Sequence, residues 1–223
     1  MPSILLLGAT GVSGLAFISA IAELQPSTKL TVLVRNRLRL PSGINARVVE
    51  GSLDSEATVE TALEGVDTVV SFLGAYVSLK AFLTRDTTTP IGDAFRVVTR
   101  VMKRKGIKRV LVLSTTSAFQ LPGETFTWGQ WLIGLMPPFV VPQGNAEMRA
   151  LALAVAEEDD FDYTIFRVPH LTEGGPDNKV WAGLMGPEYQ GGIDLTRDSL
   201  VRWVLKEIAE GKWVRGAPAL GNY

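Results

Sequence analysis

The chain contains no cysteine and only one histidine, and its net charge is close to zero. Without cysteine there are no disulfide bonds and there is no thiolate chemistry. The 22 basic and 23 acidic residues leave a formal net charge of −1, a balance that favours neither nucleic acid nor an anionic membrane as a partner. We therefore expect a small-molecule ligand, with no nucleic acid, membrane or metal at the functional site.

Long hydrophobic runs are also missing. The longest apolar stretch, residues 131–141, is too short to span a bilayer and is interrupted by Gly134, Pro137 and Pro138. The chain enters a core strand without the charged and apolar regions of a signal peptide, so the expected location is the cytosol. The 223 residues, of which 46% are hydrophobic, are predicted to form one domain, residues 1–223, with a sizeable core.

The N-terminal segment combines a strand with a glycine-rich turn. Residues 3–7 form an apolar run that is typical of a strand buried on both faces. Gly8, Gly11 and Gly14 follow it and let the chain turn tightly into a helix, whose free N–H groups can bind a pyrophosphate. This pattern predicts a dinucleotide-binding site, and the alternative is a glycine-rich turn without a ligand.

The end of the second predicted strand indicates which dinucleotide binds. A carboxylate about 20 residues after the glycines would bind the ribose 2′-hydroxyl of NAD. This strand ends instead in Arg35, followed by Arg37 and Arg39. Because a guanidinium group suits a 2′-phosphate, the sequence predicts NADP(H) as the cofactor. Arg37 by itself is interpreted as part of a solvated basic turn.

Strand and helix patterns alternate along the chain, which is the signature of a doubly wound parallel sheet. We predict an α/β Rossmann fold with strands at residues 3–7, 30–34, 46–50, 67–72, 108–113 and 162–167, and a short final strand around 213–215. Helices are expected near residues 12–24, 55–64, 91–105, 143–158 and 197–210. The last of these begins with Thr196 or Asp198 as its cap.

Residues 115–142 depart from this alternation, and a small substrate-side lid is predicted at roughly residues 115–142 and 171–195. The aromatic stretch 126–136 is expected to contact a flat substrate, although an amphipathic helix packed on the body or a dimer contact is an open alternative. The predicted substrate-binding residues are Phe119, Trp128, Trp131 and Met136, with Trp181, Leu184 and Met185 on the other side of the cleft.

Short motifs spread over most of the chain resemble those of a known family. They are Gly8-Ala9-Thr10-Gly11, Thr31-Val32-Leu33-Val34-Arg35, Phe72-Leu73-Gly74, Thr116-Ser117-Ala118-Phe119 and Val168-Pro169-His170-Leu171. With these motifs the chain resembles the NAD(P)H-binding, NmrA-like branch of atypical short-chain dehydrogenases/reductases, and within it the biliverdin reductase B (flavin reductase) group.

The resemblance implies a set of cofactor and catalytic residues. Those implied for the pyrophosphate and the 2′-phosphate are Gly8, Thr10, Gly11, Val12, Ser13, Arg35 and Arg39. Those implied for the adenine and for the ribose on the nicotinamide side are Ser52, Leu53, Leu73, Gly74 and Ala75, with Ser52 standing where relatives usually carry an aspartate. Those implied at the reacting centre are Ser117, Thr116 and His170.

The tyrosine and lysine pair of most short-chain dehydrogenases is not recognisable in the chain. Relatives often have Lys-x-x-x-Glu, and counting back from Glu147 places Phe139 and Gln143 at the tyrosine and lysine positions. Neither side chain can act as an acid or a base. We therefore expect hydride transfer that depends on positioning, with the chemistry supplied by the cofactor.

Three functions are compatible with these patterns. The first is an NADPH-dependent reductase of a small aromatic or conjugated substrate, such as a flavin, quinone, tetrapyrrole or polyketide-like ketone. The second is a non-catalytic dinucleotide sensor of the NmrA type, and the third is a cofactor-retaining isomerase or cyclase. NADPH oxidation with a panel of acceptors would separate the first from the other two. No oligomeric state is assigned from the sequence.

Overall fold

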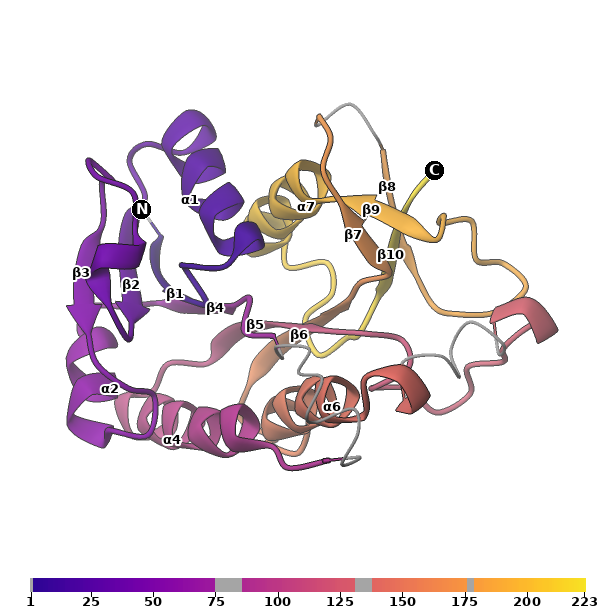
Figure 1. Ribbon diagram of the computed structural model, residues 1–223, viewed down its shortest axis with the longest axis horizontal. Helices are drawn as coiled ribbons and strands as arrows, with labels where there is room; N and C mark the ends of the chain where they lie inside the picture. Colours follow the sequence, from indigo (N-terminus) through magenta and orange to yellow (C-terminus); the bar gives the residue numbers. More distant parts are fainter. Residues whose placement is uncertain (1, 75–85, 131–137, 176–178) are drawn as a thin grey trace.

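The fold is built on a large, mostly parallel sheet (Figure 1). The computed structural model describes residues 2–74, 86–130, 138–175 and 179–223. Within these residues eight strands pair in the order β3-β2-β1-β4-β5-β6-β10-β8. Their bounds are β1 (Ser3–Leu7), β2 (Lys29–Val34), β3 (Arg47–Glu50), β4 (Thr68–Ser71), β5 (Arg109–Ser114), β6 (Asp162–Arg167), β8 (Val180–Gly183) and β10 (Ala219–Asn222).

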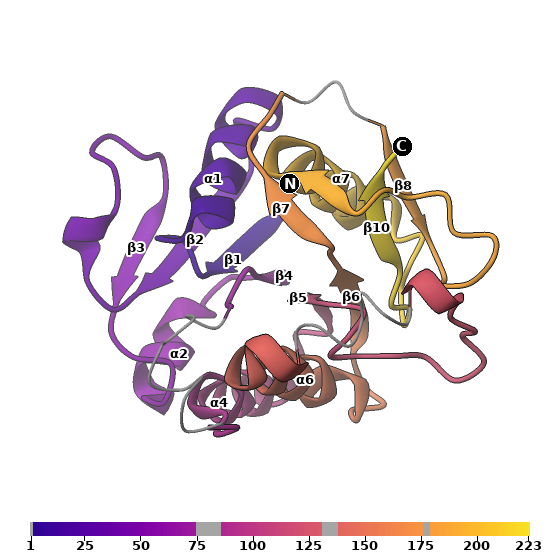
Figure 2. The same cartoon turned by 45° about the vertical axis from the view of Figure 1, so that its right-hand side comes forward.

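Helices cover both faces of this sheet, as expected for a Rossmann fold (Figures 1 and 2). One face carries α1 (Val12–Leu24) and α7 (Arg197–Glu210), and the other carries α2 (Glu56–Ala62), α4 (Pro90–Lys105) and α6 (Pro142–Ala156). All five residues of β1 are buried, because a central strand between two helical layers has no solvent-facing side. The predicted fold class is confirmed.

The chain reverses its direction across the sheet between β1 and β4. From β1 it moves outward through β2 to β3, and it then returns to place β4 on the other side of β1. In open α/β sheets, ligands bind outside the carboxyl ends of the strands at such a switch point. The turns that follow β1, β2, β4, β5 and β6 therefore define the region of the functional site.

The end of the chain differs from the sequence-based expectation. Residues 213–215 form a turn, in which Arg215 has a φ of 57° and donates its N–H to the Tyr163 carbonyl oxygen. The last strand is β10, which lies parallel to β6 and antiparallel to β8. The strand predicted around 213–215 is thus wrong, because the backbone turns at Arg215 and pairing with β6 begins only after it, at the bridge between Gly216 and Thr164.

A small second sheet contains β7 (His170–Thr172) and β9 (Asp194–Thr196), which pair in parallel. These strands and β8 are not among the strands predicted from the sequence. Thr196 ends β9 and also caps α7, where its hydroxyl accepts a hydrogen bond from the Ser199 N–H. This resolves the choice between the two predicted caps in favour of Thr196.

A buried carboxylate ties α6 to α4. Glu147, with 2% of its surface exposed, accepts hydrogen bonds from the N–H groups of Ile91 (3.0 Å) and Gly92 (2.8 Å) in the first turn of α4. A helix N-terminus has free N–H groups and a partial positive charge, so the carboxylate satisfies both requirements. The contact orients α6, and α6 contributes to the site described below.

Candidate functional site

The first glycine of the N-terminal motif is required by the backbone and by packing. Gly8 has a φ of 82°, and a Cβ at this position would lie 2.7 Å from the backbone carbon of Phe72. Phe72 is buried and follows β4, and its N–H donates to the Leu7 carbonyl oxygen at 3.0 Å. Gly8 therefore allows the turn after β1 to lie directly against the end of β4.

The other two glycines have different roles. A Cβ on Gly14 would overlap the carbonyl oxygen of Gly8, so Gly14 lets α1 pack on the turn that precedes it. Gly11 has a φ of −81°, and its Cβ would meet only the Gly8 carbonyl oxygen, at an ordinary distance of 3.4 Å. Neither the backbone nor packing requires glycine there. Its bare, exposed surface suits a ligand that approaches the backbone closely.

The start of α1 has no side-chain cap and no acidic residue in its first turn. Gly11 is the N-cap and provides no side-chain hydrogen bond. Val12 is 57% exposed, and Thr10 and Ser13 are half-buried beside it. The unpaired N–H groups of a helix N-terminus favour a negatively charged group such as a phosphate. The geometry therefore fits the residues expected to bind a pyrophosphate.

Arginine side chains follow the carboxyl end of the neighbouring strand. Arg35 comes directly after β2, and Arg39 ends a short 3-10 helix, η1 (Arg37–Arg39). All three arginines of this segment are exposed, and no salt bridge to any of them is found within the described ranges. The guanidinium groups of Arg35 and Arg39, which have no acidic partner among the described residues, therefore suit a phosphate on the ribose.

The residues expected around the adenine and the second ribose follow β3 and β4. Ser52 is exposed and Leu53 is half-buried after β3, while Leu73 and Gly74 are half-buried after β4. The nearest atom to a Cβ on Gly74 would be the Met148 methyl carbon, at 3.8 Å, so α6 borders this position. Ala75 lies outside the described residues.

The turn after β5 contains a connected set of polar side chains. The Thr115 and Ser117 hydroxyl oxygens are 3.0 Å apart, and the Ser117 hydroxyl donates to Asn145 Oδ1 at 3.0 Å. Asn145 lies in the first turns of α6, which is held on β5 by a 3.1 Å hydrogen bond from the Ser114 hydroxyl to the Met148 carbonyl oxygen. Thr116 is half-buried in the same turn.

The single histidine lies beyond the adjacent strand. His170 begins β7, its side chain is 76% exposed, and its Nδ1 is 2.9 Å from Asp194 Oδ1 on β9. Ser114 and Arg167 are paired in register at the ends of β5 and β6, so Ser117 and His170 each follow that pair by three residues. In the described part of the chain each makes its own hydrogen bonds and none joins the two side chains.

The positions counted for the tyrosine and lysine pair do not contact Ser117. Phe139 is 57% exposed, and the Gln143 amide nitrogen lies 3.3 Å from the Thr88 hydroxyl and 3.5 Å from Asp86 Oδ2. The residue of α6 that does reach Ser117 is Asn145. Sequence reasoning missed it because 28 residues separate it from Ser117 and because asparagine matches no expected motif.

The residues predicted to line the substrate cleft have different environments. Phe119 is half-buried against the core, whereas Trp128 is 73% exposed. Trp131 and Met136 lie outside the described residues. The two predicted lid segments do contact each other, since the Gln130 amide donates to the Gly186 carbonyl oxygen at 3.0 Å.

A buried ion pair holds these segments on β6. Arg167 and Glu124 have side-chain exposures of 0% and 1% and form two hydrogen bonds of 2.6 Å. Arg167 also donates to the Phe119 carbonyl oxygen, and Glu124 accepts from the N–H groups of Leu121 and Met185. Burial raises the pKa of Glu124, whereas the hydrogen bonds from Arg167 and the two N–H groups lower it. The lowering is larger than the rise, so the pKa of Glu124 lies below the ordinary value.

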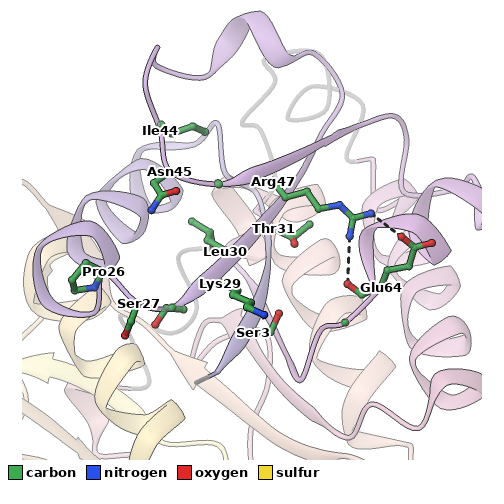
Figure 3. Close-up of a pocket in the computed structure, with 13 residues that line it drawn as sticks. Ser3, Pro26, Ser27, Lys29, Leu30, Thr31, Ile44, Asn45, Arg47 and Glu64 are labelled. Carbon is green, nitrogen blue, oxygen red and sulfur yellow. Dashed lines mark hydrogen bonds and ion pairs between the residues drawn. The ribbon is translucent and has the colours of Figure 1, made fainter.

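A separate hollow of about 610 Å³ opens at the amino ends of the strands (Figure 3). It is lined by the first residues of three strands, Ser3, Lys29 and Arg47. The Arg47 guanidinium group is engaged with Glu64 Oε2 at 2.9 Å. This hollow is at the opposite end of the strands from every predicted cofactor residue, and parallel α/β sheets bind their ligands at the carboxyl ends.

The described residues contain neither a candidate metal site nor a candidate membrane span. This part of the chain has no group of three or more His, Cys, Asp or Glu side chains that could hold a metal ion. None of its helices is both long enough and apolar enough to cross a bilayer. The expected cytosolic location stays a prediction.

The fold is shared with many solved proteins. A short-chain dehydrogenase/reductase from Veillonella parvula DSM 2008 in complex with NADP superposes with a TM-score of 0.77, at 19% identity over 99% of this chain and 94% of that one. The anaerobillin reductase ChuY from Escherichia coli O157:H7 superposes with a TM-score of 0.73, at 17% identity over 98% and 96%. The oxidoreductase ylbE from Lactococcus lactis has a TM-score of 0.73, at 17% identity over 99% and 91%.

Similarity at this level of identity establishes the Rossmann fold, and no curated protein matches the chain. The family is established by sequence, because the NAD(P)H-binding family matches residues 8–210, almost the whole chain. That match begins at the first glycine of the N-terminal motif and includes the ends of β2, β4, β5 and β6. The chain therefore belongs to the NAD(P)H-binding family.

Proposed function

We propose that this protein is an NADPH-dependent oxidoreductase that reduces a small aromatic or conjugated substrate and does so without a tyrosine and lysine pair. Two features together carry the proposal. The N-terminus of α1 at Gly11 is open, and Arg35 and Arg39, which follow β2, have no acidic partner among the described residues. The first feature suits a pyrophosphate. The second suits the 2′-phosphate that distinguishes NADPH from NADH.

The cofactor would lie across the switch point of the sheet. Residues after β1 would hold the pyrophosphate, Arg35 and Arg39 the 2′-phosphate, and Leu73 and Gly74 the ribose on the nicotinamide side. When bound, NADPH supplies the hydride, which carries two electrons, and the reduction also needs one proton from the protein or water. The NADP complex of the Veillonella protein, which has the same fold, supports a nucleotide in this region.

His170 is the side chain best suited to supply that proton. Its Nδ1 lies 2.9 Å from Asp194 Oδ1, so donation of the Nδ1 proton to this carboxylate would orient the imidazole. The Nε2 atom then remains to donate to a reduced substrate. The short loop from β6 to His170 starts from the buried Arg167, so the imidazole projects from a rigid base.

The substrate would enter between the turn after β5 and the two segments that meet near Gly186. A flat conjugated molecule would suit the aromatic stretch 126–136 that the sequence predicts to contact the substrate. ChuY, which shares the fold, is an anaerobillin reductase, and this supports the tetrapyrrole member of the proposed class. Flavins and quinones share the same chemistry, because each accepts a hydride into a conjugated ring system.

The proposal is tested by following NADPH oxidation with FMN, biliverdin and menadione as acceptors, with NADH in parallel. We expect turnover with NADPH for at least one acceptor and weaker binding of NADH. Binding of NADPH without turnover of any acceptor would contradict the reductase and favour the sensor or the isomerase.

A His170→Ala variant then tests the proton donor. General acid catalysis contributes about 10²–10⁴-fold, so we expect turnover to fall by at least about 10²-fold. Because the side chain is 76% exposed, the melting temperature and the affinity for NADPH should hardly change. Unchanged turnover in His170→Ala would exclude this residue while leaving the reductase intact.

A further inference from the structure

Hydrogen-bond directions in the turn after β5 are determined by the chemistry of the groups. Asn145 Oδ1 is a carbonyl oxygen that only accepts, so the Ser117 hydroxyl must donate its single proton to it across the 3.0 Å contact. Ser117 then has no proton for Thr115, and the 3.0 Å contact between the two hydroxyls requires Thr115 to be the donor. Thr115 in turn accepts from the Ala118 N–H at 3.3 Å.

This chain of hydrogen bonds has a consequence for the substrate. The hydroxyl proton of Ser117 is already used, so Ser117 offers an incoming ligand no donor. The Asn145 amide is held through its oxygen, and its NH₂ group makes no hydrogen bond within the described residues. Asn145 is half-buried, on the first turns of a helix that is anchored at Ser114 and at Glu147. It therefore presents two rigidly oriented N–H donors.

We infer that Asn145 is a substrate-binding residue of this enzyme, whose amide NH₂ donates a hydrogen bond to a carbonyl oxygen of the substrate, while Ser117 and Thr115 position that amide. The inference rests on the proposed function. It also narrows the substrate class to conjugated molecules with a ring carbonyl or lactam oxygen beside the reduced atoms. Such an oxygen gains negative charge as the hydride arrives, and a preorganised neutral donor stabilises that charge without a proton transfer.

The test compares Asn145→Asp with wild type at pH 8, using FMN and biliverdin as acceptors. Aspartate has the same shape and still accepts from Ser117, but it offers no donor when ionised. An acidic residue in the first turns of a helix is also compatible with the helix dipole, so the fold should be retained. We expect kcat/KM to fall by about 10²-fold, the loss typical for one donor to a developing oxyanion, with an unchanged dissociation constant for NADPH.

A pH profile separates a donor from a structural residue. Once protonated, the carboxyl group introduced by Asn145→Asp would again be a donor, so the activity of this variant relative to wild type should rise as the pH is lowered from 8 towards 5. A residue with only a structural role would give a constant ratio. Gln143→Ala is the matched control, because it removes an amide two positions earlier in the same helix, and it should retain wild-type activity.

The outcomes distinguish the two proposals. Full activity of Asn145→Asp at pH 8 in an active wild-type background would overturn the inference and leave the reductase standing. Loss of activity in Ser117→Ala together with full activity in Asn145→Asp would assign the donor to Ser117 instead. A wild-type protein that oxidises no NADPH with any acceptor would overturn the proposed function and this inference with it.

Discussion

Arg167 and Glu124 form a two-fold hydrogen-bonded ion pair whose members are 43 residues apart and are both almost completely inaccessible to solvent. Arg167 is the last residue of β6, and Glu124 lies in the segment that follows β5. The pair also connects to Met185, so it joins the two segments that we assign to the substrate side. His170 follows Arg167 by three residues, so this buried pair holds the end of β6 from which the chain continues to His170.

Removal of the charge on Glu124 is expected to destabilise the protein strongly. In a Glu124→Gln variant the buried Arg167 guanidinium group would lose its counter-charge, and breaking such a pair costs about 3–5 kcal/mol. Urea unfolding measures this loss. The matched control is Glu157→Gln, which breaks the exposed pair with Arg96 and should change the free energy of unfolding by less than about 1 kcal/mol. Equal effects of the two variants would contradict the importance of the buried pair.

The same pair predicts a dependence of stability on pH. The pKa of Glu124 in the folded protein lies below the ordinary value of 4.5 that applies to the unfolded chain. The contribution of this carboxylate is therefore fully present above about pH 4.5 and is lost as the pH falls through the lower, folded-state pKa. Unfolding of wild type and Glu124→Gln between pH 7 and pH 3 should show a stability difference that shrinks towards the acid end. A constant difference would mean that Glu124 does not titrate as described.

Cofactor preference is expected to depend on Arg35. The Arg35→Ala variant should bind NADPH roughly tenfold or more weakly and bind NADH almost unchanged, since a hydrogen bond to a charged group contributes about 1.5–3 kcal/mol. Calorimetric titration of both cofactors measures this difference. Arg37→Ala is the control, because Arg37 is exposed in the same segment but is interpreted as a solvated residue. Equal losses for NADPH and NADH in Arg35→Ala would refute the assignment of the 2′-phosphate.

The glycines of the N-terminal motif should separate stability from binding. In Gly14→Ala the new methyl group would overlap the Gly8 carbonyl oxygen, so we expect a lower melting temperature and impaired NADPH binding. In Gly11→Ala the methyl group has room and the φ of −81° is acceptable to alanine, so the melting temperature should be retained. NADPH affinity should nevertheless fall in Gly11→Ala, because the methyl group covers the surface that the pyrophosphate would approach. Normal NADPH affinity in Gly11→Ala would argue against a pyrophosphate at this position.

Local patterns were sufficient for much of the fold. The apolar run of β1, the glycine spacing and the alternation of strands and helices predicted a Rossmann fold, because buried parallel strands and helix starts each have a signature within a few residues. The final strand was misplaced, since the sequence around Trp213 has a strand-like composition but the backbone turns at Arg215. Composition does not reveal where a short left-handed turn interrupts pairing.

The sequence by itself determined the family, the glycine-rich turn after β1 and the arginines after β2, because each depends on residues that are neighbours in the chain. Only the tertiary structure decided that Asn145 contacts Ser117, that Glu147 caps α4 and that Glu124 neutralises Arg167. These partners are 28, 55 and 43 residues apart, and single asparagine and glutamate residues have no local pattern that marks them. The folding of β5, β6 and α6 against one another brings them together, so their roles follow from packing and not from any motif.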